Sequence, residues 1–328
     1  MLLFSLTFIL AVLAVGGGLL RFYFWSAPAA STAYTVDIPP KSGTLVIGQK
    51  LQAAGVVRHA GVFRYYAFLS GQARRLKAGE YAFPSGVTLP QVVRQLVLGQ
   101  IVQHPFLVPE GYTAKQIADK LEAEGLAKAA DFLGVVDDAN AASTWEVPAR
   151  TLEGFLFPDT YELTKGMSAS QIAHEMVKRF KEKAGSVLPG APLAPLPLVT
   201  LASIIEREVK APAERPRVAS VFYNRLAKRM RLESCATVLY GLGRAGGALS
   251  LDDLQSASPY NTYRHAGLPP APISNPGLSA LQAAAHPDQS EYLFFVVAGD
   301  GTHIFSKDFE SHKKAKWAHK KARRPLQP

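Results

Sequence analysis

The sequence predicts an α+β protein in which a small part built from strand–helix units precedes a larger mixed α/β part. Three stretches repeat a strand, a glycine turn and an amphipathic helix: FPSGVTLPQVVRQL (83–96), VPEGYTAKQIADKL (108–121) and LTKGMSASQIAHEM (163–176). Each carries Gly-x-Ser/Thr-x-x-Gln before an apolar residue, which is the spacing of a helix capping box. The cap pairs are Thr88/Gln91, Thr113/Gln116 and Ser168/Gln171. Near the C-terminus, YLFFVV (292–297) predicts a buried strand, and Thr302–Ser306 predicts a second strand after a turn.

A fourth, less regular copy of the unit begins at Ile38. The segment IPPKSGTLVIGQKLQAAGV (38–56) aligns without a gap with VPEGYTAKQIADKLEAEGL (108–126). One interpretation is that ordinary strand–helix capping patterns recur in any protein of this class. The other is a small module of the LysM kind, which binds amino-sugar polymers. Spacing alone does not choose between them.

The N-terminal segment is strongly apolar. Leu2–Leu20 carries no charge, and nineteen helical residues span roughly 28 Å, close to the bilayer core of about 30 Å. Four aromatic residues follow at 22–25, as at a membrane interface. We therefore predict a transmembrane anchor over 1–25 and a small-residue linker over 26–33. The alternative is a cleaved signal peptide with Ala27-Pro28-Ala29 as its cleavage site, and either interpretation exports the rest of the chain.

Charge and cysteine content narrow the classes of partner. The chain has 36 Lys+Arg against 26 Asp+Glu, a net charge of +10, so polyanions such as cell-wall polymers or lipid headgroups fit it. Part of this charge lies in a basic tail at 313–328, which suggests a flexible electrostatic arm. No aromatic-interleaved nucleic-acid motif accompanies the charge, so we expect no nucleic-acid partner. The single cysteine, Cys235, excludes an intrachain disulfide.

Motifs for cofactors and metals are missing. The sequence has no GxGxxG, Walker loop, GxSxG elbow or HExxH, and its eight histidines do not follow metal-ligand spacing. We therefore expect no cofactor and no metal.

The helical stretch LVTLASIIEREV (198–209) places two carboxylates beside a long apolar run. Glu206 and Glu208 lie on opposite sides of the apolar stripe, about equally far from its centre. They fit a solvated helix edge around Arg207. Geometry alone favours that interpretation, whereas the apolar composition of the helix favours a carboxyl group held in apolar surroundings, whose raised pKa suits a general acid. Periodicity leaves this choice open.

Several motifs in one order resemble the MltG/YceG family of endolytic murein transglycosylases. They are LEGFLFPDTY (152–161), ASIIEREV (202–209), ASVFYNRL (219–226), YNTYRHAGLPPAPISNPG (260–277), LSALQAAAHP (278–287) and YLFFV…GTHIFS (292–306). The resemblance runs from about residue 34 to 312. It implies a membrane anchor, a LysM-like subdomain over 34–104 and a catalytic domain over 105–312.

The resemblance also implies roles for single residues. Glu206, the first acid of the A-S-I-hydrophobic-E motif, is expected to be the catalytic acid. The substrate-binding candidates are Glu153, Asp159, Tyr161, Tyr260, Asn261, Tyr263 and Asn275. Loop anchoring, turn capping and ordinary packing are the alternative roles for these side chains.

The implied reaction needs only one carboxyl group. In a lytic transglycosylase the C6 hydroxyl of N-acetylmuramic acid attacks within the substrate and leaves a 1,6-anhydro end, so no second carboxylate has to supply or activate the nucleophile. The expected partners are peptidoglycan glycan strands and penicillin-binding synthases, and the expected place is the inner membrane with the catalytic part in the periplasm.

One position departs from the resemblance. Where the family usually reads L-x-x-D-P-T-V, this chain has Cys235 and Ala236 in place of Asp-Pro. The second hypothesis is therefore a non-catalytic peptidoglycan-binding protein of the same fold.

Overall fold

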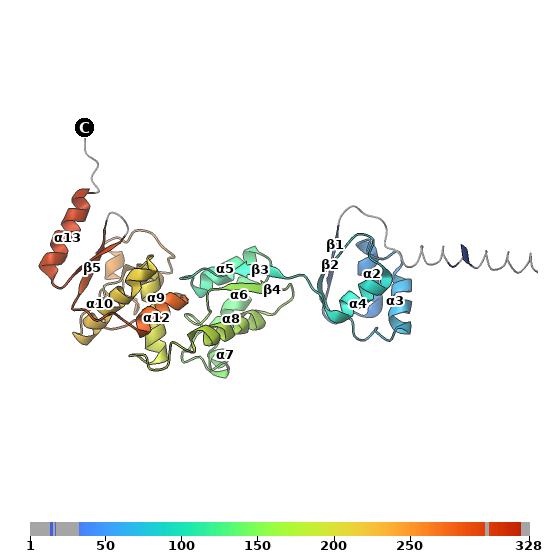
Figure 1. Ribbon diagram of the computed structural model, residues 1–328, viewed down its shortest axis with the longest axis horizontal. Helices are drawn as coiled ribbons and strands as arrows, with labels where there is room; N and C mark the ends of the chain where they lie inside the picture. Colours follow the sequence, from blue (N-terminus) through green and yellow to red (C-terminus); the bar gives the residue numbers. More distant parts are fainter. Residues whose placement is uncertain (1–13, 16, 18–32, 299–301, 323–328) are drawn as a thin grey trace, which may run out of the picture. The chain divides into compact units, whose positions relative to one another are not determined.

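A computed structural model describes residues 14, 15, 17, 33–298 and 302–322 (Figure 1). The predicted anchor over 1–25 lies almost entirely outside the described residues, and so does the linker over 26–33. Within the described residues, none of the helices combines the length and the apolar character needed to cross a bilayer.

The chain divides into two compact units. The first unit ends at Pro105 and also takes in Glu162–Met167, whereas the second contains Phe106–Tyr161 and everything from Ser168 onward. The sequence-based boundary between residues 104 and 105 stays a prediction.

The first unit is a two-stranded antiparallel sheet covered by helices. Its elements are β1 (Tyr34–Ile38), α2 (Thr44–Ala53), α3 (Ala60–Leu69), β2 (Gly79–Phe83) and α4 (Leu89–Leu98). The ladder pairs Tyr34 with Phe83 and Ile38 with Gly79. Side chains from the sheet and all three helices meet in one core, which includes Ile38, Leu51, Phe63, Tyr81, Phe83 and Leu96. Burial of each of these side chains stabilises the folded unit by about 1.5–3 kcal/mol, so the core compensates for the few hydrogen bonds of a two-stranded sheet. The LysM-like character of this unit stays a prediction.

The capping boxes predicted from the repeated pattern are confirmed. At α5 (Ala114–Ala123), Gln116 N donates to Thr113 Oγ1 (3.2 Å) and Thr113 N donates to Gln116 Oε1 (3.0 Å). Ser168 and Gln171 make the same pair of bonds at α8 (Ala169–Ala184), with lengths of 3.2 and 2.8 Å. Gly111 precedes the first of these caps with φ 75°, a left-handed conformation that glycine adopts without strain.

Most of the remaining elements form the second unit. Strands β3 (His104–Leu107) and β4 (Thr160–Leu163), whose ends extend into the first unit, pair in a two-stranded sheet. The other elements are α6 (Ala129–Val136), α7 (Ala139–Thr144), α9 (Pro195–Glu208), η1 (Pro212–Glu214), α10 (Arg215–Ala227), α11 (Cys235–Gly241), η2 (Asp253–Gln255), α12 (Leu278–Ala285), β5 (Phe294–Val297), β6 (His303–Ser306) and α13 (Phe309–Ala322). Helix α9 packs against α10, α11 and α12, and all its residues from 198 to 205 are buried. The predicted, largely buried helix is thus confirmed, with α10 and α12 beside it (Figure 1).

The C-terminal part differs from the sequence expectation in two respects. Strands β5 and β6 form the predicted antiparallel pair, but β5 is only half-buried rather than fully buried. Residues 313–322 continue helix α13, so the flexible arm predicted from their charge is wrong for this stretch. At the start of the helix, Ser311 N donates a capping hydrogen bond to Asp308 Oδ1 (2.8 Å). The Phe309 ring packs against Phe294 of β5, with 5.9 Å between the ring centroids. A cap and an apolar contact thus order a segment that its charge alone would leave solvated.

Candidate active site

Both carboxylates of the last turn of α9 are withdrawn from water. The Glu206 side chain is only 4% exposed, and burial raises the pKa of both Glu206 and Glu208. A solvated helix edge therefore does not describe these two carboxylates, because desolvation is the largest influence on the pKa of each. The C-terminal end of a helix also disfavours negative charge, which acts in the same direction as burial.

Glu206 is held by a buried cation. Its Oε1 lies 2.5 Å from Arg215 Nη2, and its Oε2 accepts a hydrogen bond from Gly277 N (3.0 Å). Arg215 is itself buried, and its only other acidic neighbour among the described residues is Glu110 at 3.7 Å. Arg215 and the Gly277 amide counteract the effect of burial on the pKa of Glu206. Protonating Glu206 would leave a buried guanidinium poorly paired, which is costly.

Glu208 has neutral partners instead. Ser234 Oγ donates to Glu208 Oε1 at 2.5 Å, and within the described part of the chain no basic group approaches the Glu208 carboxylate to ion-pair distance. Burial raises the pKa of Glu208, while hydrogen bonds from Ser234 and the Ala236 amide, and the more distant charges of His303 and Arg207, oppose this. A proton can therefore enter or leave Glu208 without unpairing a buried charge.

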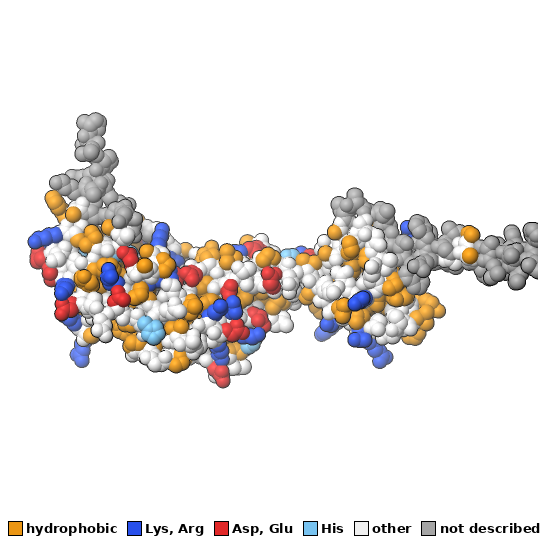
Figure 2. Space-filling model, in the orientation of Figure 1, with side chains coloured by type: hydrophobic (Ala, Val, Ile, Leu, Met, Phe, Trp, Pro, Cys, Tyr) orange, Lys and Arg blue, Asp and Glu red, His pale blue; other side chains and the backbone are white. Residues whose placement is uncertain are grey.

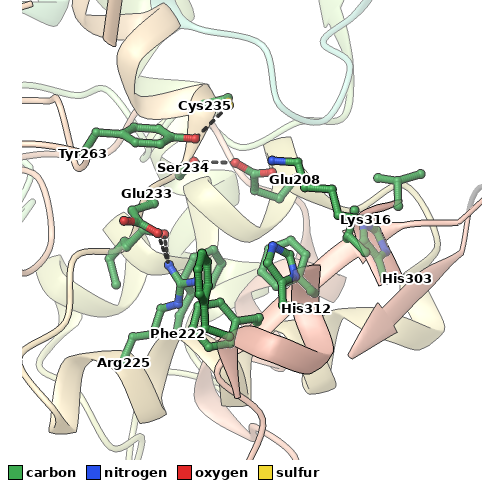
Figure 3. Close-up of a pocket in the computed structure, with 16 residues that line it drawn as sticks. Glu208, Phe222, Arg225, Glu233, Ser234, Cys235, Tyr263, His303, His312 and Lys316 are labelled. Atoms are coloured by element: carbon green, nitrogen blue, oxygen red, sulfur yellow. Dashed lines mark hydrogen bonds and ion pairs between the residues drawn. The ribbon is translucent and has the colours of Figure 1, made fainter. Parts of the chain in front are cut away.

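Glu208 also faces a cavity of about 370 Å³ (Figure 3). This size falls in the range of roughly 300–1,000 Å³ that is usual for small-molecule sites. The lining comes from the end of α9, from α10, from the 232–235 segment, from β5 and from α13, and includes Arg225, Glu233, Ser234, Cys235, Tyr263, Phe294, His303, His312 and Lys316. Glu206 is not among the lining residues. In the described chain, no group of three or more His, Cys, Asp or Glu side chains has a metal-binding arrangement.

A strained turn positions Ser234. Glu233 adopts φ 52°, which is unusual for a residue with a side chain, and its carboxylate lies 3.3 Å from Arg225 Nη1. The Ser234 amide donates to Thr262 Oγ1 (3.0 Å), so the serine is held on both sides. Sequence reasoning missed Ser234, because its contact with Glu208 joins positions 26 residues apart.

Of the predicted substrate-binding residues, Tyr263 reaches the same cavity as Glu208. Its hydroxyl lies 3.2 Å from the Sγ atom of Cys235, the residue that stands where the family resemblance predicts aspartate. Tyr260 instead packs its ring 4.9 Å from that of Tyr240. Asn261 is buried and folds its own loop, since Nδ2 donates to Leu254 O and Ser256 O (3.0 and 2.8 Å).

Glu153 and Asn275 lie together in a buried network. Asn275 Oδ1 accepts from Gly154 N and Leu156 N (both 2.9 Å), and Asn275 Nδ2 donates to Glu153 Oε1 (3.0 Å). Glu153 also accepts from Ala114 N at 3.1 Å. These contacts join three distant segments of the chain, so both side chains anchor loops, which is the alternative role predicted for them.

Asp159 directly precedes strand β4, and Tyr161 lies within it. Asp159 Oδ2 accepts from Arg179 Nε of helix α8 (2.6 Å), and the Tyr161 hydroxyl donates to Phe157 O (2.5 Å). Neither residue lines the cavity at Glu208. Their predicted role in substrate binding stays a prediction.

Glu153 is expected to make stability depend on pH. Burial raises its pKa from 4.5 to about 7, so the folded chain binds more protons than the unfolded chain between these values. The free energy of unfolding therefore falls as pH rises from about 4.5 to 7, by on the order of 3 kcal/mol. Urea denaturation at pH 5, 6, 7 and 8 measures this, with Glu153→Gln as the variant that cannot titrate there. Glu206 and Glu208 titrate in both proteins, so parallel pH curves for the two would contradict the assignment to Glu153.

Comparison with known proteins identifies the family. The model of the YceG-like family matches residues 36–318, which is most of the chain. The chain belongs to this family. It is 33% identical over 306 residues to an endolytic murein transglycosylase of Bacillus subtilis, covering 88% of this chain and 85% of that protein. It is 31% identical to an endolytic murein transglycosylase of Streptococcus pneumoniae, covering 85% of this chain and 57% of that protein.

A solved structure agrees with the family assignment. The crystal structure of a yceG-like protein from Listeria monocytogenes matches with a TM-score of 0.59 and 37% identity, covering 87% of this chain and 99% of that one. The YceG-like resemblance predicted from the motifs, and a mixed α/β fold, are thereby confirmed. Within this YceG-like chain, the departure at Cys235 falls on the lining of the cavity.

Proposed function

We propose that this YceG-like protein cleaves peptidoglycan glycan strands internally, between N-acetylmuramic acid and N-acetylglucosamine, with Glu208 as the general acid. The names of its relatives in Bacillus subtilis and Streptococcus pneumoniae support the reaction class. The observation that carries the proposal is the Glu208 carboxyl group, which faces a cavity and has only neutral hydrogen-bond partners among the described residues. Burial raises the pKa of that group, which favours the protonated form that a general acid needs.

The reaction proceeds with one carboxyl group. Glu208 gives its proton to the glycosidic oxygen as the bond from that oxygen to C1 of N-acetylmuramic acid breaks. The C6 hydroxyl oxygen of the same sugar bonds to C1, and its proton passes to the Glu208 carboxylate. The products are a 1,6-anhydro end and a free hydroxyl end, and the carboxyl group is restored. Because the nucleophile belongs to the substrate, its attack does not carry the entropic cost of a second molecule.

The choice of Glu208 differs from the sequence prediction of Glu206, which stays a prediction. What favours Glu208 is a difference in partners. The ion pair with Arg215 opposes protonation of Glu206. The Ser234 hydroxyl, in contrast, can donate to Glu208 when the carboxylate is ionised, and can rotate to accept from it when the carboxyl group is protonated. In this proposal Glu206 positions the end of α9 against Arg215 and Gly277.

Product analysis tests the reaction. The full chain is incubated with purified peptidoglycan, and the released fragments are examined by mass spectrometry. We expect 1,6-anhydromuramyl ends within the strands. Reducing ends would indicate hydrolysis and contradict the proposal, and binding without cleavage would support the alternative, a non-catalytic peptidoglycan-binding protein.

The finer parts of the proposal concern location and partners. The uncharged run from 2 to 20 would anchor the chain in the inner membrane, with the second unit in the periplasm. The LysM-like first unit would bind amino-sugar polymer, and penicillin-binding synthases would supply nascent strands. Flotation of the full chain with liposomes, compared with a chain that starts at residue 26, tests the anchor.

Alkylation of Cys235 is expected to block cleavage. The thiol is exposed and lines the cavity beside Tyr263, so a maleimide adduct would intrude where the glycan has to lie. Displacing the bound sugar by about 1 Å is enough to slow the reaction roughly 100-fold. The measurement is cleavage rate before and after N-ethylmaleimide, with Cys235→Ser as the matched control that the reagent should not affect. Full activity of the stoichiometrically modified protein would place the glycan elsewhere.

A further inference from the structure

Helix α3 of the first unit has an apolar outer face. Tyr65, Phe68 and Leu69 are 65, 72 and 64% exposed, although large side chains on the solvent side of a helix are usually polar. Their positions, together with Arg64, follow the i, i+3, i+4 spacing of one helical face. The opposite face, with Phe63 and Ala67, is buried in the core of the unit. We call Arg64, Tyr65, Phe68 and Leu69 the α3 face.

The apolar surface continues at the start of α2. Thr44 Oγ1 donates to Ala73 O (3.4 Å), which places the first turn of α2 beside the segment that follows α3. Leu45 and Val46 in this turn are also exposed. Figure 2 shows hydrophobic side chains gathered over α3 at one end of the unit, with Lys and Arg side chains on the adjoining surface. A contiguous apolar area of this kind marks an interaction site.

The charge of the first unit indicates an anionic partner. Residues 34–105 contain eight Lys+Arg and two Asp+Glu, so their net charge is +6. One of the two acids, Glu80, is buried and paired with Lys165 and His104. Arg64 in the α3 face, and Arg74 and Arg75 in the segment that follows α3, are all exposed, and none of them forms an ion pair within the described part of the chain. Apolar side chains bordered by unpaired arginines are the pattern of a surface that lies in the interface of an anionic membrane.

We propose that the first unit docks on an anionic lipid bilayer through the α3 face. Tyr65, Phe68 and Leu69 enter the boundary between headgroups and acyl chains, and Arg64, Arg74 and Arg75 contact lipid phosphates. The sequence supports the same occupant, because only 13 residues separate the apolar run ending at Leu20 from Tyr34. Fully extended, they reach at most about 45 Å. The argument from linker length rests on the proposed membrane anchor. The exposure of the α3 face and the positive charge of residues 34–105 do not depend on that anchor.

Docking keeps the first unit at the membrane surface. Each arginine near an anionic surface contributes to binding, and the effect falls off within a Debye length, about 8 Å at physiological ionic strength. Removing the charge of all three arginines lowers the docking constant roughly 100-fold.

The test uses the full chain with one fluorescent reporter. In a Cys235→Ser background, Phe68→Cys carries an environment-sensitive nitrobenzoxadiazole probe, and the protein is reconstituted into phosphatidylglycerol-rich or pure phosphatidylcholine liposomes. Leu251→Cys is the matched control, because Leu251 is an apolar side chain of the second unit that is 83% exposed, against 72% for Phe68. Nitroxide-labelled lipids then report whether the probe reaches the bilayer. A further variant of the Phe68→Cys protein replaces Arg64, Arg74 and Arg75 with glutamine.

We expect a blue shift and quenching at position 68 in anionic liposomes, little effect at position 251, and loss of quenching with the glutamine variant or in 1 M NaCl. The salt arm needs no variant, so it remains decisive if the triple variant folds poorly. A probe at position 68 that stays in water while the chain floats with the liposomes overturns docking and leaves the anchor intact. A probe at position 68 that is quenched equally in both lipids, whatever the salt, overturns the anionic selectivity. Quenching at 68 in a chain that lacks residues 1–25 would confirm docking without the anchor.

Discussion

Glu208→Gln is expected to lower the rate of glycan cleavage by about 10²–10⁴-fold, which is the usual contribution of a general acid. Glutamine keeps the size of the side chain and an oxygen that can accept from Ser234, but it has no proton to give to the glycosidic oxygen. The rate of the unmodified protein should also fall as pH rises through the pKa of Glu208, because only the protonated form acts. Initial rates of anhydro-end formation across pH 5–8 measure both effects.

Glu206→Gln is the matched control, since it makes the same chemical change two residues away. It removes the buried charge that pairs with Arg215 at 2.5 Å, so the expected cost is stability, about 3–5 kcal/mol, rather than chemistry. Below its lowered melting temperature this variant should still cleave with the pH dependence of the unmodified protein. If folded Glu206→Gln loses cleavage while Glu208→Gln keeps it, the acid is Glu206, as the sequence predicts.

The contrast between these two residues shows where sequence reasoning stops. Both lie in the last turn of α9, on opposite sides of its apolar stripe, so periodicity treats them alike. What distinguishes them comes from far along the chain: Gly277 lies 71 residues from Glu206, and Ser234 lies 26 residues from Glu208. Capping boxes were predictable because donor and acceptor are three residues apart. The helix over 313–322 was not, because its order depends on a packing contact with Phe294.

The resemblance to family motifs also identified residues that take part in important contacts, but it did not predict what those residues contact. Glu153, Asn261 and Asn275 belong to the motifs that identify the family, yet in the structure their side chains hold loops together. A family motif identifies a required side chain, but it does not distinguish a side chain that contacts the sugar from one that anchors a loop. Only Tyr263 of the predicted substrate-binding set lines the cavity described at Glu208.

Asn275→Ala is expected to lower the free energy of unfolding of the second unit by about 4 kcal/mol. The change leaves the Gly154 and Leu156 amides without their acceptor and removes the donor to Glu153, all in a region closed to water. Each unsatisfied buried group costs about 1–3 kcal/mol, and the sum corresponds to a fall in melting temperature of roughly 10 °C.

Thermal unfolding measured beside cleavage rates separates anchoring from substrate binding. Asn140→Ala, at an exposed position of helix α7, is the matched control and should change the free energy of unfolding by less than about 0.5 kcal/mol. Because the amide of Asn275 is fully engaged with the chain itself, the cleavage activity that remains in folded Asn275→Ala should keep its substrate concentration dependence. A variant that melts like the unmodified protein but binds glycan poorly would show instead that Asn275 contacts the sugar, as the family motif predicts.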